Sequence, residues 1–245
     1  MTQAAKQQHT ASQLDAFRDI VRSRRSIRRF TDEPIPDDVV EDCLDLAMLA
    51  PNSSNLQPWS FYVVKSPALK EQLAHACLGQ NAARTAPVLI AIVARTGTWR
   101  AHSQQVLDNW PEPEVPKIVK SYYSKVAPIH YNQGPFGLYG VAKRAMGMVA
   151  GLRRPVPRWP YSPSAMKVWA AKSTALAAEN LMLALRAHGY DSCPMEGFDS
   201  CRVNKLLSIP KDGEVIMILA AGRRAEKGIY GPQYRLDKSE LVTWL

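Results

Sequence analysis

The most informative stretch of the chain is Pro51-Asn-Ser-Ser-Asn-Leu-Gln-Pro-Trp59. Five of its side chains carry amide or hydroxyl groups, which donate and accept hydrogen bonds without adding charge. Pro51 cannot continue the helix before it, and Pro58 restricts the residue that precedes it, so the loop is stiff at both ends. Composition alone favours an ordinary polar loop between a helix and a strand. The same chemistry also suits a large planar polar heterocycle, and three other segments strengthen that interpretation.

The sequence around this loop predicts alternating helices and strands. Apolar residues at helical spacing predict a helix ending in the basic run 22–29, and a second helix with an apolar face over 40–48, capped by Asp37 or Asp38. A strand follows at 61–65. Ser66-Pro67 fits the start of a third helix, and residues 86–94 read as a buried strand. The loop therefore joins a helix to a strand.

The second half of the chain is less regular until residue 164. Residues 95–163 hold many prolines and aromatic residues, and they predict an insertion with helices near 117–125 and 141–149. A long helix at 164–188 closes at Gly189, Asp199 can cap a short helix, and 214–221 reads as a strand. The chain thus predicts one α+β domain over 1–245, with a small mixed or antiparallel sheet flanked by helices, an insertion at about 95–163 and a C-terminal arm at about 222–245.

Composition limits the class of protein. With 46% hydrophobic and 22% charged residues the composition is that of an ordinary globular protein, and no apolar run approaches the ~20 residues of a membrane helix. The polar N-terminus lacks the apolar core of a signal peptide, which predicts cytoplasmic residence and no membrane partner. The cysteines form no C-x-x-C pair and the histidines no metal-ligand spacing. We therefore expect no metal, and reduced thiols in or near the core at Cys43, Cys77, Cys193 and Cys201.

The positive charge has two interpretations. A net charge of +9 is compatible with nucleic-acid binding, or with an anionic cofactor and cosubstrate in a positive cleft. In the segment Arg24-Arg-Ser-Ile-Arg-Arg-Phe30, residues Arg24, Ser26 and Arg28 point the same way if the backbone is extended. Two guanidiniums and a hydroxyl on one side could hold a phosphate monoester, although a solvated basic helix end gives the same pattern.

Two later segments complete the set. In Cys193-Pro-Met-Glu-Gly-Phe-Asp199 a glycine permits close approach of backbone N–H groups to a ligand, or forms a plain turn. Gly222-Arg-Arg and Gly231-Pro-Gln-Tyr-Arg235 add guanidinium groups to the C-terminal segment. Taken in order, the four segments resemble the nitroreductase family of FMN-dependent oxidoreductases. The resemblance covers roughly 17–70 and 164–236, and residues 95–163 match nothing in it.

The resemblance implies a role for each position. The FMN phosphate would be held by Arg24, Arg25, Ser26, Arg28 and Arg235, with help from either Arg223 or Arg224. The polar loop would reach the same flavin from the other subunit through Pro51, Asn52, Ser53 and Asn55, with Gln57 bracing the loop. Beside the isoalloxazine would lie Pro194, Met195, Glu196 and Gly197, with a backbone N–H of Glu196 or Gly197 on flavin N5. Gln80 or Asn81 would contact the pyrimidine edge.

The family resemblance also implies an assembly and a reaction. Family members are intertwined homodimers with two FMN sites at the interface, so the C-terminal segment would wrap the partner. NAD(P)H would reduce the flavin, and a nitroaromatic or quinone-type acceptor would reoxidise it in a ping-pong cycle that needs no catalytic side chain. A flavin-modifying enzyme or a reductive dehalogenase on the same fold is an alternative. A nucleic-acid-binding protein is a further alternative, but no recognised nucleic-acid module is present.

Overall fold

The centre of the molecule is a four-stranded sheet. A computed structural model describes residues 3–245, and its named strands are all antiparallel to their neighbours, in the order β1-β2-β4-β3. They are β1 (Trp59–Val64), β2 (Val88–Arg95), β3 (Asp191–Met195) and β4 (Gly213–Gly222). The predicted α+β class with a small sheet is confirmed, and the sheet is antiparallel rather than mixed.

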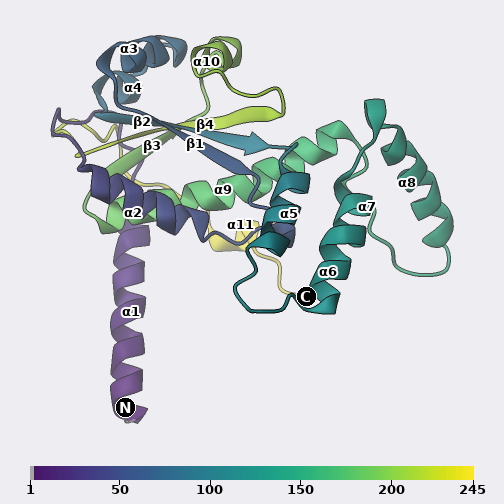
Figure 1. Ribbon diagram of the computed structural model, residues 1–245. Helices are drawn as coiled ribbons and strands as arrows, with labels where there is room; N and C mark the ends of the chain where they lie inside the picture. The colour runs from purple at the N-terminus through teal and green to yellow at the C-terminus, as the bar shows by residue number, and fades with distance from the viewer. Residues whose placement is uncertain (1–2) are drawn as a thin grey trace.

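Helices cover both faces of this sheet (Figure 1). One face packs against α2 (Asp37–Met48) and α9 (Pro163–Ala187), and the other against α3 (Pro67–Ala76), α4 (Asn81–Thr85) and α10 (Ser200–Leu206). Leu89, Ala91 and Val93 of β2 enter the core under α3 and α10, whereas Val88, Ile90 and Ile92 enter the core under α2 and α9. Successive strand residues point to opposite faces, so an unbroken apolar run suits a strand that is covered on both sides.

The ends of the helices test the predicted caps. Asp199 accepts a hydrogen bond from the Arg202 amide at 3.0 Å, so the predicted cap of α10 is confirmed. Gly189 closes α9 in the left-handed region, with φ +80°. The prediction that Asp37 or Asp38 caps α2 is wrong, because Pro36 holds the cap position and no side chain caps the helix. Both carboxylates lie instead in its first turn, where the helix dipole favours negative charge.

Several elements were not predicted, and the strand β3 and the helix α5 are the most important of them. β3 carries Pro194 and polar residues, so it lacks the apolar run of a buried strand, and its place at the edge of the sheet tolerates a proline. The helix α5 (Trp99–Asp108) starts the region of residues 95–163 and has too few apolar residues to show a clear stripe.

Cys201 is exposed on α10, so the prediction of a core or near-core thiol is wrong there. Cys43, Cys77 and Cys193 are buried, and all four thiols are free.

Residues 95–163 form a helical excursion beyond the end of the sheet (Figure 1). After α5 come α6 (Lys117–Ser121), a π-helical turn (Tyr122–Val126), α7 (Ala127–Tyr131), a 3-10 turn (Pro135–Gly137) and α8 (Leu138–Ala150). The helix predicted near 117–125 thus continues to Tyr131, and α8 includes the helix predicted near 141–149. Trp99 and Tyr131 pack with Leu56 and with Trp169 of α9 in a separate apolar cluster. The loop before β1 is therefore anchored to this excursion.

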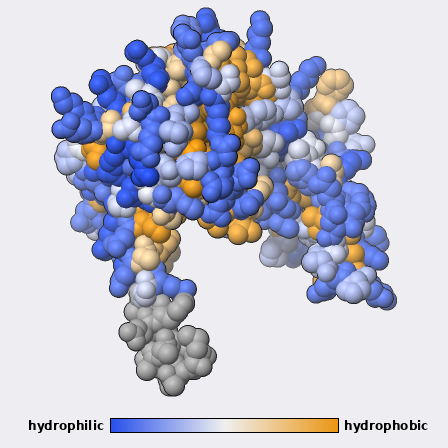
Figure 2. Space-filling view, turned by 60° about the vertical axis from the view of Figure 1, so that its left-hand side comes forward, coloured by the Kyte–Doolittle hydropathy of each residue, from blue (hydrophilic) through white to orange (hydrophobic). Residues whose placement is uncertain are grey.

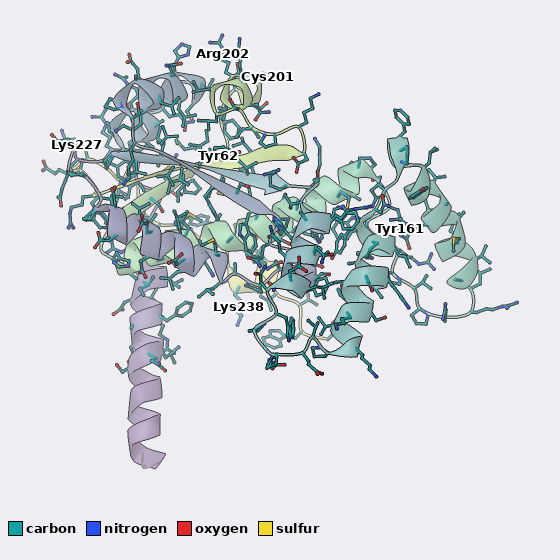
Figure 3. The ribbon with its side chains drawn as sticks, in the orientation of Figure 1. Tyr62, Tyr161, Cys201, Arg202, Lys227 and Lys238 are labelled. Carbon is teal, nitrogen blue, oxygen red and sulfur yellow. The ribbon has the colours of Figure 1, made fainter. Side chains whose placement is uncertain are left out.

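Both ends of the chain extend from this body. The helix α1 (Gln3–Ser23) projects from the sheet and its helices, and Leu14, Phe17 and Val21 on it are exposed; Figure 2 shows orange apolar atoms beside its grey end. The segment after Gly222 carries α11 (Lys238–Leu241), and it runs from Lys227 at the left edge of Figure 3 to Lys238 near the middle of the view. Trp244 is 84% exposed. Within residues 3–245 no helix is long and apolar enough to cross a membrane.

Candidate functional site

The basic segment after α1 runs beside the edge strand β3. Ser26 pairs with Ser192 in a parallel bridge, and the Ile27 amide donates to the Ser192 carbonyl at 3.0 Å. Ile27 is fully buried, which fixes the segment on the sheet. The Arg28 amide donates to the Gly228 carbonyl at 2.7 Å, so the start of the C-terminal segment lies on the other side of the same backbone. The guanidinium groups are thus carried on a fixed backbone.

Arg24 and Arg28 lie near one buried thiol. Arg28 Nη1 is 3.3 Å from Cys193 Sγ. Burial raises the pKa of Cys193, and the positive charges of Arg28 and Arg24 act in the opposite direction. Neither arginine takes part in an ion pair with a carboxylate among residues 3–245. Two guanidiniums near one point of the sheet edge can therefore receive an external anion.

Arg25 is separated from these two arginines. It donates to the Gly231 carbonyl at 2.6 Å and lines a cavity of about 450 Å³ with Arg22, Arg186, Arg223 and Arg224. Three of this second group have carboxylate partners: the buried Asp191 accepts from Arg224 at 2.7 Å and from Arg186 at 3.0 Å, and Glu33 accepts from Arg223 at 2.6 Å. The hydrogen bond to Asp191 also raises the pKa of Arg224. Arg25 thus lies on a different side of the backbone from the expected phosphate cradle.

The polar loop at residues 51–57 has a strained backbone. Ser54, Asn55 and Gln57 have φ values of 61°, 48° and 45°, in the left-handed region that non-glycine residues rarely adopt. Asn52 closes the loop, because its Oδ1 accepts from the Gln57 amide at 2.8 Å and its Nδ2 donates to the Ala50 carbonyl at 3.2 Å. Its amide is thereby occupied within the loop. Such strain persists only where the surroundings enforce it.

Three tyrosines of the helical excursion hold the loop 51–57 in this strained conformation. Ser54 Oγ lies 2.5 Å from the Tyr122 hydroxyl and 2.7 Å from the Tyr131 hydroxyl, and Ser53 Oγ lies 3.0 Å from Tyr131. The Tyr123 hydroxyl donates to the Ser54 carbonyl at 2.9 Å. Burial raises the pKa of Tyr131, against the effect of its hydrogen bonds to the serines. Sequence reasoning missed these residues, because nothing in the pair Tyr122-Tyr123 indicates contact with a loop some 70 residues earlier.

A cavity of about 900 Å³ opens beside this loop. Asn55 and Gln57 line it together with Trp59 and Phe61 of β1 and with α5. On α5, His102 Nδ1 is 2.7 Å from the Leu56 carbonyl, which ties this helix to the loop. Pro51 and Ser53 are exposed at the rim of the same region of the chain. The cavity has the size and the mixed polar and aromatic lining of a small-molecule site.

The segment Pro194–Gly197 ends β3 and turns toward α10. Met195 is buried, whereas Glu196 and Gly197 are exposed. Gln80 Nε2 donates to the Gly197 carbonyl at 2.7 Å, so of the two side chains predicted beside this segment Gln80 makes the contact, and Asn81 donates to the Tyr230 hydroxyl at 3.0 Å. Arg235 is exposed and donates to its neighbour Tyr234; in the described part of the chain no hydrogen bond joins it to the other predicted phosphate ligands.

The predicted residues thus fall into two groups at opposite edges of one sheet. Ser26 pairs with β3, while Gln57 lies two residues before the start of β1, and the order β1-β2-β4-β3 places these strands three intervals apart. At about 4.8 Å per interval, the two edges are about 14 Å apart. A single chain does not bring the loop and the arginines to one point.

Comparison with known proteins identifies the family. The Nitroreductase family matches residues 21–223. A Thermus thermophilus protein named NADH dehydrogenase is 31% identical over 221 residues, covering 90% of this chain and 92% of that protein. A nitroreductase structure from Exiguobacterium sibiricum, solved in complex with FMN, is 26% identical with a TM-score of 0.66, covering 94% of this chain and 97% of that one. An oxidoreductase structure from Staphylococcus epidermidis, 21% identical, has a TM-score of 0.72 and covers 94% of this chain and 95% of that one, which supports the fold.

This chain belongs to the nitroreductase family, as its four motifs predicted. It is accordingly an enzyme of the nitroreductase type, an oxidoreductase.

Proposed function

We propose that the protein is an FMN-dependent oxidoreductase that uses NAD(P)H to reduce nitroaromatic or quinone-type acceptors in a ping-pong cycle. The observation that carries the proposal is the pair of free guanidiniums, Arg24 and Arg28, fixed beside β3 next to Ser26. Relatives named as NAD(P)H nitroreductases, and the relative solved with FMN, support the choice of cofactor and cosubstrate.

The residues present fit the phosphate of FMN. Arg186, Arg223 and Arg224 already have carboxylate partners, whereas Arg24 and Arg28 have none within residues 3–245. A doubly charged phosphate monoester would supply the missing acceptors through charge-assisted hydrogen bonds. The chain has no G-x-G-x-x-G turn that would hold the pyrophosphate of a dinucleotide. FMN is therefore a better fit than FAD.

The site we propose is shared by two copies of the chain. Arg24 and Arg28 lie at one edge of the sheet and the loop 51–57 at the other, about 14 Å away. One flavin can meet both groups if a second copy brings its own loop to the first copy's arginines. Arg235, exposed on the C-terminal segment, joins the phosphate in the same assembly. We therefore propose a homodimer with two sites.

FMN held here would supply the hydride and two-electron chemistry that links NAD(P)H to the acceptor. The chain's own residues bind and orient it. The backbone N–H of Glu196 or Gly197, both exposed just after β3, would donate to a nitrogen of the flavin ring. Asn55 and Gln57 contribute neutral polar groups from the partner, and the adjoining cavity has room for a planar acceptor. No nucleophilic side chain is required.

The proposal is tested on the protein as purified. Denaturation releases the flavin, chromatography identifies it, and we expect FMN at about one per chain. Steady-state assays with NADH and with NADPH, against nitroaromatic, quinone and halogenated aromatic acceptors, then assign the reaction and the preferred nicotinamide. Bound FAD, or no flavin even after reconstitution with FMN, contradicts the cofactor. Flavin breakdown, or dehalogenation as the fastest reaction, contradicts the proposed acceptor.

A further inference from the structure

The helix α8 directs its small residues inward and its large apolar residues outward. Gly140 and Gly147 are buried against Tyr161, which lies beside this helix in Figure 3. A Cβ atom on Gly147 would lie 3.0 Å from the Tyr161 hydroxyl, and one on Gly140 would collide with the Tyr161 carbonyl. The packing side of α8 is therefore its glycine side.

The opposite side of α8 carries an unpartnered apolar stripe. Leu138, Val141, Val149 and Leu152 recur at helical spacing, and they are 62%, 68%, 70% and 86% exposed. Phe136, just before the helix, is also fully exposed. Proteins rarely leave such a contiguous apolar patch in water unless it binds something. α8 also lies at the outer end of the helical excursion, far from the sheet (Figure 1).

The part of the chain that carries the stripe is strongly basic. Between Val115 and Ala178 the chain has ten Lys and Arg residues and no Asp or Glu. Arg144 on α8 and Arg153 and Arg154 just after it are exposed, and none of the three forms an ion pair with a residue of 3–245. Tyr139 and Trp159 are aromatic residues of the kind that prefer a membrane–water interface. The partner of this surface must be apolar and negatively charged.

We propose that α8, with the basic segment that follows it, binds the surface of a membrane that contains anionic lipid. Its apolar stripe enters the boundary between head groups and acyl chains, and Arg144, Arg153 and Arg154 contact the lipid phosphates. A helix that lies in this plane needs an apolar face and a cationic rim rather than the length of a spanning helix. The expectation of no membrane partner rested on missing apolar runs, which exclude only spanning.

A second copy of the chain fits this surface less well. A second copy that packed its α8 against this α8 about a two-fold axis would set the arginines of one helix against those of the other. Nucleic acid would satisfy the arginines but would leave the four aliphatic side chains in water. A lipid surface satisfies both features. The inference is independent of the proposed flavin chemistry, and it places the enzyme where acceptors that dissolve in the bilayer are concentrated.

Vesicle binding tests the inference with the full-length protein as purified. We expect flotation with vesicles of phosphatidylcholine and phosphatidylglycerol at 7:3, weaker binding to phosphatidylcholine alone, and loss of binding as salt increases. The double variant Val141→Glu/Val149→Glu places two carboxylates in the stripe and should weaken binding about a hundredfold. Leu78→Glu is the matched control, because Leu78 is 73% exposed on a different part of the surface, and it should bind like the wild type.

A charge variant separates the electrostatic contribution to vesicle binding from the apolar contribution. Arg153→Gln/Arg154→Gln should weaken binding to the anionic vesicles about tenfold and leave binding to phosphatidylcholine unchanged. Circular dichroism and the flavin spectrum establish that each variant is folded. Wild-type protein that stays with neither vesicle overturns the inference, and so does a glutamate variant that binds as the wild type does. A glutamate variant that changes from dimer to monomer by light scattering would assign the stripe to a second copy, which also overturns it.

Discussion

The two edges of the central sheet use opposite means to build a binding surface. At the β3 edge, charges are placed by ion pairs and hydrogen bonds: Asp191 holds Arg186 and Arg224, and leaves Arg24 and Arg28 free. At the β1 edge, the loop 51–57 is uncharged, and three tyrosine hydroxyls hold its strained backbone. The first edge presents charged groups and the second a neutral polar loop, and the strand order keeps the two edges apart within one chain.

The largest effect should come from removing Lys238–Leu245, because we expect this segment to join the two edges across a dimer. Burial of the exposed Val242, Trp244 and Leu245 at an interface contributes roughly 1.5–3 kcal/mol each, so the truncated dimer should dissociate at least about a thousandfold more readily. Flavin occupancy should fall with it. Light scattering and the flavin-to-protein absorbance ratio measure both. A truncated protein that remains dimeric and fully loaded would show that the edges meet in another way.

The next effect concerns the ion pairs of the β3 edge. Asp191→Asn removes the buried charge between Arg186 and Arg224, and should lower the free energy of unfolding by about 3 kcal/mol. Glu33→Gln is the matched control, since this carboxylate pairs with Arg223 on an exposed surface, where ion pairs contribute little. Urea denaturation of the flavin-free proteins measures the difference. Equal midpoints for both variants would mean that Asp191 does not organise this edge.

A third prediction separates neighbouring arginines. Arg24→Ala should weaken FMN binding by about tenfold to a hundredfold, the loss of one charge-assisted phosphate contact of roughly 1.5–3 kcal/mol. Arg25→Ala should have a smaller effect, because Arg25 lies with the second arginine group and donates to Gly231. Titration of the apo-proteins with FMN compares them. If Arg25→Ala weakened FMN binding more than Arg24→Ala did, the phosphate would belong in the cavity beside Arg25. The family resemblance alone also allows that position.

The smallest effect is expected at the β1 edge. Tyr131→Phe removes the hydroxyl that contacts Ser53 and Ser54, and should reduce stability by about 1–2 kcal/mol. FMN affinity should fall several-fold, because the loop loses its preferred shape. Tyr139→Phe, at a tyrosine 54% exposed on α8, is the control and should change neither. If the two variants behave alike, the loop keeps its conformation without the tyrosine.

The sequence predicts the layers of this fold and three of its four strands, but not the edge strand β3. The apolar run at 86–94 and the long helix up to Gly189 indicate their structures directly, because burial on both faces and helical periodicity are local patterns. β3 gives no such pattern, since an edge strand with Pro194 and a buried Asp191 is stabilised by partners elsewhere in the chain. Helix α5 was missed for the same reason, because His102 and Trp99 act through contacts with the loop and α7.

The site shows the same division. Arg24, Ser26 and Arg28 could be grouped from their spacing, because every second residue of a short extended segment points to the same side. Their separation from Arg25 follows the same rule. The partners of Ser54 could not be found in this way, because Tyr122 and Tyr131 are brought to it by the packing of Trp169 against the excursion. Contacts between distant segments form only in the folded chain, so they produce no periodic pattern in the sequence.

The position of β2 in the sheet has a consequence during synthesis on the ribosome. Its inner neighbour β4 ends at Gly222, more than a hundred residues after Arg95, so the nascent strand remains unpaired on one side for most of translation. At about 5–20 residues per second this interval lasts roughly 6–25 s. An uncharged run from Val88 to Ala94 is then available to chaperones or to the same run of a neighbouring chain. Yields of the native enzyme should therefore depend on translation speed and chaperone supply more than on the stability of the finished sheet.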